Sequence, residues 1–184
     1  MFIPIKDAIL DMTPEEFEKH SLLILTEKTK GLENVRIVHD KHIKAHDGNY
    51  QLDGYIEFEV MGVLYKSIVE CKHYKKPISR EIVQKLYDNL RATGAQKGIL
   101  ISSSNFQSGA IQYAQEHGIA LIQLTEAGED YSTRSRLNVV MMHSRTPYND
   151  GIPYIGVLQQ QNDIGISCSY LTKCSDALAS FLRK

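Results

Sequence analysis

Hydrophobic residues recur at helical spacing in several segments of this chain. Residues 13–16 (TPEE) supply a threonine N-cap, a proline at the first helical position and a glutamate three residues after the cap, which predict a helix from residue 13 to about residue 30. Ser79 begins a second predicted helix that runs to about residue 92, with an apolar stripe at every fourth position. Further helices are predicted at residues 106–116 and 175–183.

Polar and apolar residues alternate between residues 50 and 60, which is typical of a half-buried strand. One predicted face holds Leu52, Ile56, Phe58 and Val60, and the other holds Asp53, Tyr55, Glu57 and Glu59. Met61-Gly62 predicts a tight turn into a second strand over residues 63–72, with Val69 and Cys71 on one face. A short strand near residues 35–38 and a polar loop over residues 40–49 are expected before this hairpin.

Strand and helix alternate after the hairpin. Apolar strands at residues 98–102 and 119–124 flank the helix at 106–116, and this order implies parallel pairing through right-handed crossovers. The predicted fold class is therefore α/β, with a helix, an antiparallel hairpin, and then parallel strands with crossover helices. Two strands, at residues 154–160 and 164–170, are expected after an irregular loop around residues 147–153.

Composition and charge exclude several classes of protein. No run of 18 apolar residues is present, so no membrane span is expected, and the N-terminus lacks the pattern of a secretory signal. Three cysteines without a C-x-x-C pair favour a reduced, cytoplasmic protein. The net charge is −1, but residues 72–97 carry seven basic side chains against two acidic ones, which makes this segment attractive to phosphate.

Two carboxylates and a lysine are predicted to meet on one face of the hairpin. Glu70 and Lys72 are two residues apart in a strand and therefore point the same way. If the turn pairs Val60 with Val63, then Asp53 lies directly opposite Glu70, with Cβ atoms about 4.5–5.5 Å apart. Two carboxylates this close repel each other unless a cation or a proton lies between them.

The first helix adds a fourth residue to this cluster. At 100° per residue, Glu18 projects from the middle of the helix's apolar face. A carboxylate that points inward is costly unless it is paired or bound to a metal. We therefore expect Glu18 to have a partner.

Other readings of these residues stay open. D…E-x-K spacing is common on solvated strand faces that carry cross-strand ion pairs. A rival zinc site is formed by the side chains of His39, Asp40, His42, His46 and Asp47, although their spacing matches no helix or strand face. Residues 102–105 (SSSN) are expected to cap the helix that follows them.

The combination of motifs resembles the Mrr-type restriction endonuclease family, within the PD-(D/E)xK nuclease superfamily. The resemblance is carried by residues 52–54 (LDG), 68–79 (IVECKHYKKPIS), 95–102 (AQKGILIS), Phe106 and 110–114 (AIQYA), with Phe17-Glu18 in the first helix. It covers about residues 13–124. It implies a restriction-endonuclease-like core at residues 1–124 and a C-terminal extension at residues 125–184 of unassigned role.

The resemblance also implies a metal-dependent phosphodiesterase that acts on DNA. Asp53 and Glu70 would be ligands of Mg²⁺, with Mn²⁺ as an alternative ion, and Lys72 the catalytic lysine. Glu18 would be an additional or water-mediated ligand. Gln84 resembles a glutamine found in part of the superfamily, although it is equally well read as an exposed polar residue.

The surroundings of this site suggest how DNA is held. Lys75, Lys76 and Arg80 would follow the DNA backbone without reading its sequence. A homodimer would supply the two sites that cleavage of both strands needs.

Departures from the family leave the function partly open. The family's glycine-rich approach to the aspartate is replaced by residues 48–52 (GNYQL), and no counterpart of its winged-helix DNA-reading domain is seen. Glu70 stands where many members carry glutamine, which favours an intact metal site. The alternative is an inactive nuclease fold that serves as a DNA-binding or protein-interaction module, and RNA or branched DNA are further candidate substrates.

Overall fold

The computed structural model describes residues 9–29, 31–126, 130–134, 141–145, 154–161 and 165–183. Its helices are the 3₁₀ turn η1 (Ile9–Asp11), α1 (Pro14–Lys28), α2 (Arg80–Thr93), α3 (Ser108–Glu116) and α4 (Ala177–Arg183). Its strands are β1 (Glu33–Lys44), β2 (Asn49–Val60), β3 (Val63–Lys72), β4 (Lys97–Ser102), β5 (Ile119–Glu126), β6 (Asp130–Arg134), β7 (Met141–Arg145), β8 (Tyr154–Gln161) and β9 (Ile166–Tyr170).

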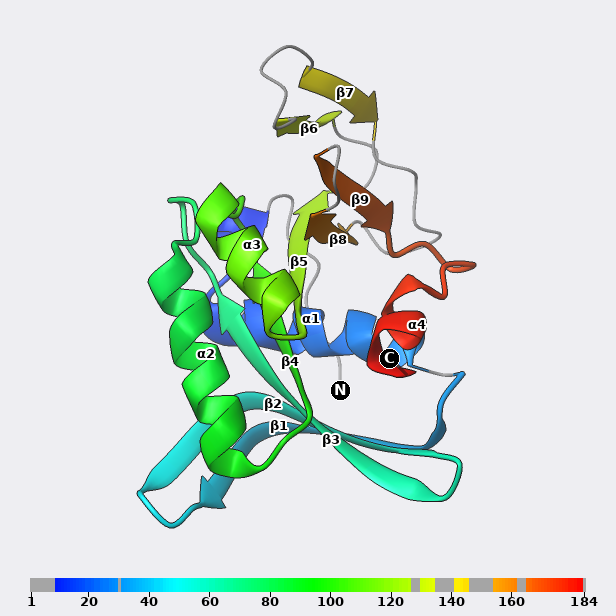
Figure 1. Cartoon of the computed structure of the whole chain (residues 1–184). Helices are drawn as coiled ribbons and strands as arrows, with labels where there is room; N and C mark the ends of the chain where they lie inside the picture. The colour runs from blue at the N-terminus through cyan, green and yellow to red at the C-terminus, as the bar shows by residue number, and fades with distance from the viewer. Residues whose placement is uncertain are drawn as a thin grey trace.

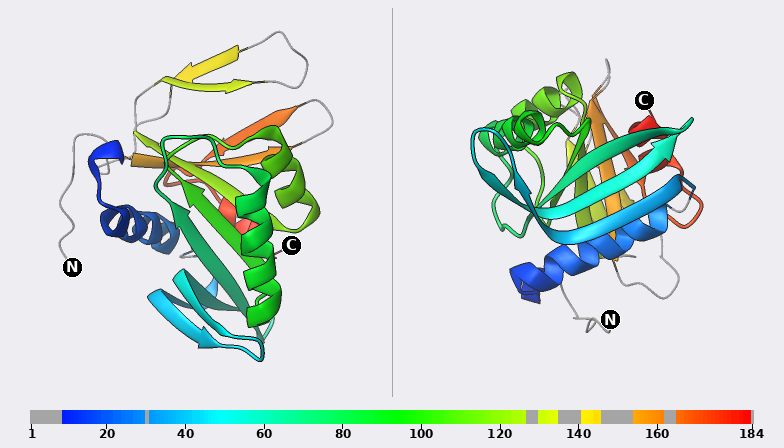
Figure 2. Two further views of the ribbon diagram at one scale, coloured as in Figure 1. Left: turned by 90° about the vertical axis from the view of Figure 1, so that its left-hand side faces the viewer. Right: turned by 90° about the horizontal axis from the view of Figure 1, so that it is seen from below.

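A mixed sheet in the order β1-β2-β3-β4-β5-β8-β9 runs through the molecule, and β6 and β7 pair as a separate ribbon (Figure 1). Strands β3, β4 and β5 are parallel, whereas the strands at both ends of the sheet are antiparallel to their neighbours. Helices α2 and α3 lie on one face of the sheet, and α1 and α4 lie on the other (Figures 1 and 2). The predicted helix, hairpin and parallel strands are therefore confirmed.

Local sequence signals explain where the helices begin and end. Thr13 caps α1 through a complete capping box, in which Glu16 N–H donates to the Thr13 hydroxyl and Thr13 N–H donates to the Glu16 carboxylate. Gly94 ends α2 with a left-handed φ of 67°, a conformation that glycine adopts without strain. Ser79 is the N-cap of α2, although its side chain makes no capping hydrogen bond.

Strand β1 is longer than predicted, and the polar loop expected over residues 40–49 is wrong. The strand extends to Lys44 and pairs with β2, leaving residues 45–48 as the turn between them. No residue of β1 is fully buried, because this strand lies at the edge of the sheet. An edge strand of this kind carries no clear alternation of apolar and polar residues, so its second half had no detectable strand signal.

Two hydrophobic cores lie on the two faces of the sheet. Ile56 and Phe58 pack with Phe17 and Leu25 of α1, whereas Leu52 packs with the residues that face α2 and α3. The prediction that Leu52 shares a face with Ile56 and Phe58 is thus wrong. The alternation changes between residues 52 and 54, where the backbone of the hairpin is distorted.

The C-terminal strands continue the main sheet. β8 pairs with β5 and β9 pairs with β8, which confirms the predicted strands in this region. The irregular loop predicted around residues 147–153 lies outside the described residues. Within the described part of the chain, no helix is both long and apolar enough to cross a membrane.

Candidate functional site

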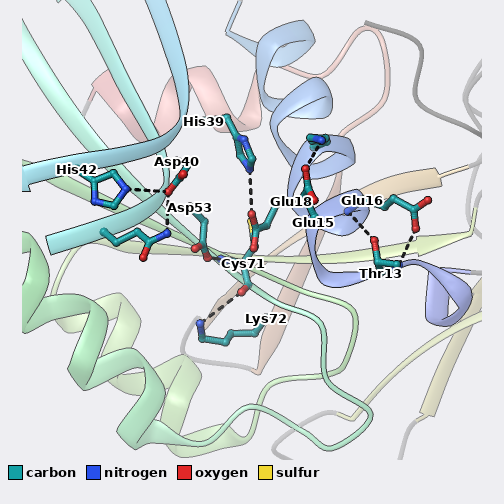
Figure 3. Close-up of polar contacts among 12 residues, drawn as sticks. Thr13, Glu15, Glu16, Glu18, His39, Asp40, His42, Asp53, Cys71 and Lys72 are labelled. Atoms are coloured by element: carbon teal, nitrogen blue, oxygen red, sulfur yellow. Dashed lines mark hydrogen bonds and ion pairs between the residues drawn. The ribbon is translucent and has the colours of Figure 1, made fainter.

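Asp53 lies where the ladder between β2 and β3 ends. The two strands pair from Val60 with Val63 as far as Gly54 with Val69, which is the predicted register. Asp53 follows directly after the last of these pairs. Its Oδ2 accepts a hydrogen bond from the Cys71 backbone N–H at 2.7 Å (Figure 3). The carboxylate is therefore the acceptor for a β3 backbone N–H that lies beyond the last ladder pair.

The backbone is irregular at the same point on the other side of β2. β1 pairs His39 with Gly54 and Lys41 with Leu52, but the intervening residues Asp40 and Asp53 do not form a ladder pair. Asp40 has a φ of 50°, a left-handed conformation that aspartate adopts more readily than most residues. This distortion coincides with the change of face in β2 and with the turn of the Asp53 carboxylate toward β3.

Glu70 and Lys72 lie side by side on the α2 face of β3, as the strand period predicts. The Lys72 ammonium donates to Glu70 Oε1 and lies 3.4 Å from the Cys71 carbonyl oxygen. Both side chains are largely sequestered from solvent, with exposed fractions of 13% for Glu70 and 19% for Lys72. Burial lowers the pKa of Lys72, but the hydrogen bond and charge of Glu70 outweigh it and raise that pKa, so the lysine remains an ammonium ion.

Asp53 shares an electrostatic environment with the other predicted site residues. The pKa of its carboxyl is raised to about 6: burial is the largest cause, the charges of Glu70 and Glu18 also raise it, and the Cys71 N–H and Lys72 oppose the rise. The structure thus brings together Asp53, Glu70 and Lys72, with Glu18 near enough for its charge to act on Asp53. An acid held in such a place favours a proton or a cation beside it.

Helix α1 packs tightly on β2, and this packing positions Glu18 near Asp53. Its Leu22, one turn after Glu18, sits over Gly54, where an added Cβ would come within 2.5 Å of the Leu22 Cδ2 atom. The expected partner of Glu18 is His39, whose Nε2 lies 2.9 Å from Glu18 Oε2 (Figure 3). Both side chains are half-buried. In the sequence, His39 is a candidate for the rival zinc site. The inward direction of Glu18 is the signal in the sequence that indicates its need for a partner such as His39.

The other members of that rival cluster do not gather around a common point. His42 lies 3.5 Å from Asp40 and His46 lies 3.9 Å from Asp47, and all four side chains are well exposed. His39 points instead toward Glu18 (Figure 3). Among the described residues, no three histidine, cysteine or acidic side chains already form a cluster that could hold a metal ion. A divalent ion would therefore have to draw its ligands together on binding.

The oxygen donors around Asp53 suit a hard divalent cation that gathers its ligands as it binds. Mg²⁺ is usually bound by one or two carboxylates with several waters, rather than by a complete protein cage. Asp53 and Glu70 offer two carboxylates, and the Cys71 carbonyl, 3.4 Å from the Lys72 ammonium, offers a third oxygen. The cost of ionising Asp53 is the property that a bound cation would offset.

The predicted DNA-contacting residues lie next to this group. Lys75 and Lys76 are exposed in the loop after β3, and Arg80 is exposed at the start of α2 with its guanidinium 5.0 Å from the centre of the Tyr113 ring. Gln84 is half-buried on α2. No hydrogen bond of its side chain to another described residue holds it in place.

The serine segment after β4 has a role that the sequence reading missed. Ser103 Oγ donates to the Tyr74 carbonyl at 3.0 Å and Ser104 Oγ donates to the Lys76 carbonyl at 2.7 Å. The expectation that residues 102–105 cap the next helix is wrong, because the N-cap of α3 is Gln107. These serines bind the basic loop instead, a contact between distant segments that no local motif predicts.

Comparison with known proteins identifies the family of the chain. The family model Mrr_cat, described as a restriction endonuclease, matches residues 9–127. No curated protein matches the sequence. The α/β architecture is the restriction-endonuclease-like fold that was predicted.

Two solved structures show weaker similarity. This chain spans only about half of one of them and about a third of the other. A protein of unknown function, AF1548, is 16% identical with a TM-score of 0.47, over 56% of this chain and 54% of that one. The DNA modification-dependent restriction endonuclease AspBHI is 15% identical with a TM-score of 0.36, over 68% of this chain and 37% of that one. The family match alone covers well over half of the sequence, and the chain therefore belongs to the Mrr_cat restriction endonuclease family.

Proposed function

We propose that this protein is a metal-dependent endonuclease that hydrolyses phosphodiester bonds in DNA. The observation that carries the proposal is the half-buried group of Asp53, Glu70 and Lys72, in which the pKa of Asp53 is raised to about 6. A solvated strand face with ordinary ion pairs, the alternative reading of the sequence motif, would not desolvate an acid to this extent. Membership of the restriction endonuclease family supports the same conclusion.

Asp53 and Glu70 would hold the divalent ion, Mg²⁺ or Mn²⁺, with the Cys71 carbonyl as a third donor and Glu18 as an additional or water-mediated ligand. A bound divalent ion supplies charge that polarises the phosphodiester and lowers the pKa of a water nucleophile. Glu18 is held by His39, and Asp53 is held by the Cys71 N–H. On metal binding, the carboxylates of Asp53, Glu70 and Glu18 would be drawn toward one position, with the Lys72 ammonium beside them.

Lys72 would act as a preorganised positive charge. Its ammonium is paired with Glu70, a proposed metal ligand, and this pairing would keep it close to the bound ion and the scissile phosphate. In that position it can orient the attacking water and stabilise the extra negative charge that develops on the phosphate. Gln84, half-buried and without a described partner, is available to contact the substrate from α2.

The exposed cations provide binding without sequence readout. Lys75, Lys76 and Arg80 would contact successive phosphates, which makes affinity depend on salt concentration. We keep two further predictions with this proposal: a catalytic region at residues 1–124 with an extension at 125–184, and a homodimer for cleavage of both strands.

The proposal is tested by incubating supercoiled plasmid with the wild type in Mg²⁺ and in EDTA, and with Lys72→Ala in Mg²⁺. We expect nicked or linear product from the wild type in Mg²⁺ only. A product that persists in the Lys72→Ala sample would contradict the assigned site. Plasmid binding without cleavage by the wild type in either Mg²⁺ or Mn²⁺ would favour the alternative, a nuclease fold that serves as a DNA-binding module.

A further inference from the structure

Tyr74 is a large aromatic side chain left exposed beside the candidate active site. It follows Lys72 by two residues and precedes the basic pair Lys75-Lys76. Its side chain is 46% exposed, in contrast to most of the large apolar side chains of the molecule. An exposed aromatic ring among cations is a combination that binds single nucleotides of a nucleic acid strand.

The backbone that carries Tyr74 is fixed at three points along the serine segment. Ser103 N–H donates to the Lys72 carbonyl at 3.1 Å, and the two serine hydroxyls bind the carbonyls of Tyr74 and Lys76. The exposed ring is therefore carried by a backbone segment whose conformation is fixed by hydrogen bonds. A preorganised contact loses less entropy on binding than a mobile one.

The neighbour of Tyr74 shows that the loop separates an inner side from an outer side. His73 turns inward, where its Nε2 lies 3.1 Å from the Met12 carbonyl oxygen and its ring stacks on Phe17 at 5.1 Å between centroids. Tyr74 consequently turns outward, on the side of the loop that is open to solvent. Tyr74 also lies near Lys72, because it is one of the groups that raise the pKa of that ammonium.

We propose that Tyr74 is a substrate-contacting residue whose ring packs against a nucleotide next to the scissile phosphate and whose hydroxyl donates to a neighbouring phosphate oxygen. Stacking of this kind tolerates any base, because every base has a π-face. It complements the phosphate contacts of Lys75, Lys76 and Arg80, which hold the strand but do not order its nucleotides. This inference rests on the proposed function, since it places the nucleic acid at the Asp53–Glu70–Lys72 group.

The contact can be observed directly because the sequence contains no tryptophan. Tyr74→Trp introduces a single tryptophan at the proposed contact, and its fluorescence can be excited selectively over that of the tyrosines. Val63→Trp is the matched control, because Val63 is 57% exposed at the other end of β3, nine residues from Lys72 and so about 30 Å away along the strand. Each variant is titrated in EDTA with a short DNA duplex that carries a single-stranded overhang, whose unpaired bases expose the π-face that the contact needs, so that binding is measured while no strand is cut.

We expect the fluorescence of Tyr74→Trp to be quenched on saturation and that of Val63→Trp to stay unchanged. Tyr74→Ala is expected to weaken duplex binding by about 5- to 100-fold, as for the loss of one base–aromatic stack, and Tyr74→Phe by less than about 5-fold. Unchanged fluorescence of Tyr74→Trp on a saturated complex, or wild-type affinity of Tyr74→Ala, would overturn the proposal. If Tyr74→Ala fails to fold, the Tyr74→Trp titration still decides.

The two proposals fail in different ways. Quenching of Tyr74→Trp with no cleavage by the wild type in Mg²⁺ would support the Tyr74 contact and overturn the nuclease. Cleavage that requires Lys72, together with wild-type binding by Tyr74→Ala, would overturn the Tyr74 contact and support the nuclease.

Discussion

Two regions of this molecule are rich in metal-binding side chains, and only one of them has the properties of a site. At the end of the β2–β3 ladder, Glu70 and Lys72 are 13% and 19% exposed. In the β1–β2 hairpin, His42 and His46 are 68% and 86% exposed, although acidic residues lie beside both. The hairpin has more histidines, but the ladder end has the buried charges.

This difference indicates that burial, rather than the number of acidic and histidine side chains, determines which group has the properties of a metal site. Water screens the exposed pairs of the hairpin, so each contributes little and none perturbs its neighbour strongly. At the ladder end, desolvation couples the charges and raises the pKa of Asp53 to about 6. Substitutions in the two regions should therefore have very unequal effects.

The largest effect is expected for Glu70→Gln, which keeps the shape of the side chain and removes its charge. Loss of a carboxylate that is proposed to bind the metal and that pairs with Lys72 should reduce plasmid cleavage by at least about 100-fold. Asp47→Asn, the same type of change in the exposed hairpin, should leave the cleavage rate unchanged. Equal losses in the two variants would remove the distinction between the regions.

The effect of an added methyl group on stability should also differ between the two regions. Gly54→Ala places a methyl group against Leu22 and Val69, where a Cβ would come within 2.5 Å and 3.0 Å of their atoms, so we expect overpacking to lower the free energy of unfolding by about 1–3 kcal/mol. Gly48→Ala in the hairpin turn meets nothing nearer than 4.0 Å and should cost much less. Denaturant unfolding of both variants measures the difference, and a harmless Gly54→Ala would show that α1 need not approach β2 so closely.

His39 is the member of the histidine group that contacts a proposed site residue, Glu18. His39→Ala should lower cleavage by about 10-fold or more, because Glu18 loses the contact that orients it, whereas His42→Ala should leave cleavage at the wild-type rate. Steady-state rates on a labelled duplex test this pair of variants. The interpretation of the Glu18–His39 contact fails if both alanine variants cut equally well.

The pH dependence of stability should reveal Asp53. Its pKa of about 6 lies above the ordinary aspartate value of 3.8, so its contribution to stability is fully present below about pH 4 and is lost as the pH rises through 6. Asp53→Asn should therefore raise the free energy of unfolding at pH 8 by about 1 kcal/mol, after allowance for the partial exposure of the group. This gain should vanish near pH 4, and an equal gain at both pH values in denaturant unfolding would contradict the account.

Much of this arrangement could be predicted from the sequence where the signal was local. The capping box at Thr13, the register of the β2–β3 hairpin and the parallel strands all followed from short-range patterns. The register predicted Asp53 directly opposite Glu70, whereas the ladder ends one pair earlier, at Gly54 with Val69. The helical wheel also indicated that Glu18 needed a partner.

Features that depend on distant segments could not be predicted. The second half of β1 is polar because it lies at the sheet edge, and the strand is formed by its partner β2 rather than by its own pattern. Leu52 changes face where Asp40 adopts a positive φ on the neighbouring strand. The serines that hold the Tyr74 loop are 28 and 29 residues away from the carbonyls they bind.

The central claim is that Asp53 and Glu70 share one divalent ion, and calorimetric titration with Ca²⁺ at pH 8 tests it most directly. The account predicts one ion bound per chain by the wild type, with binding lost in both Asp53→Asn and Glu70→Gln and kept in the hairpin variant His42→Ala/His46→Ala. Wild-type Ca²⁺ affinity in either of the two site variants, or its loss in the hairpin variant, would contradict the account.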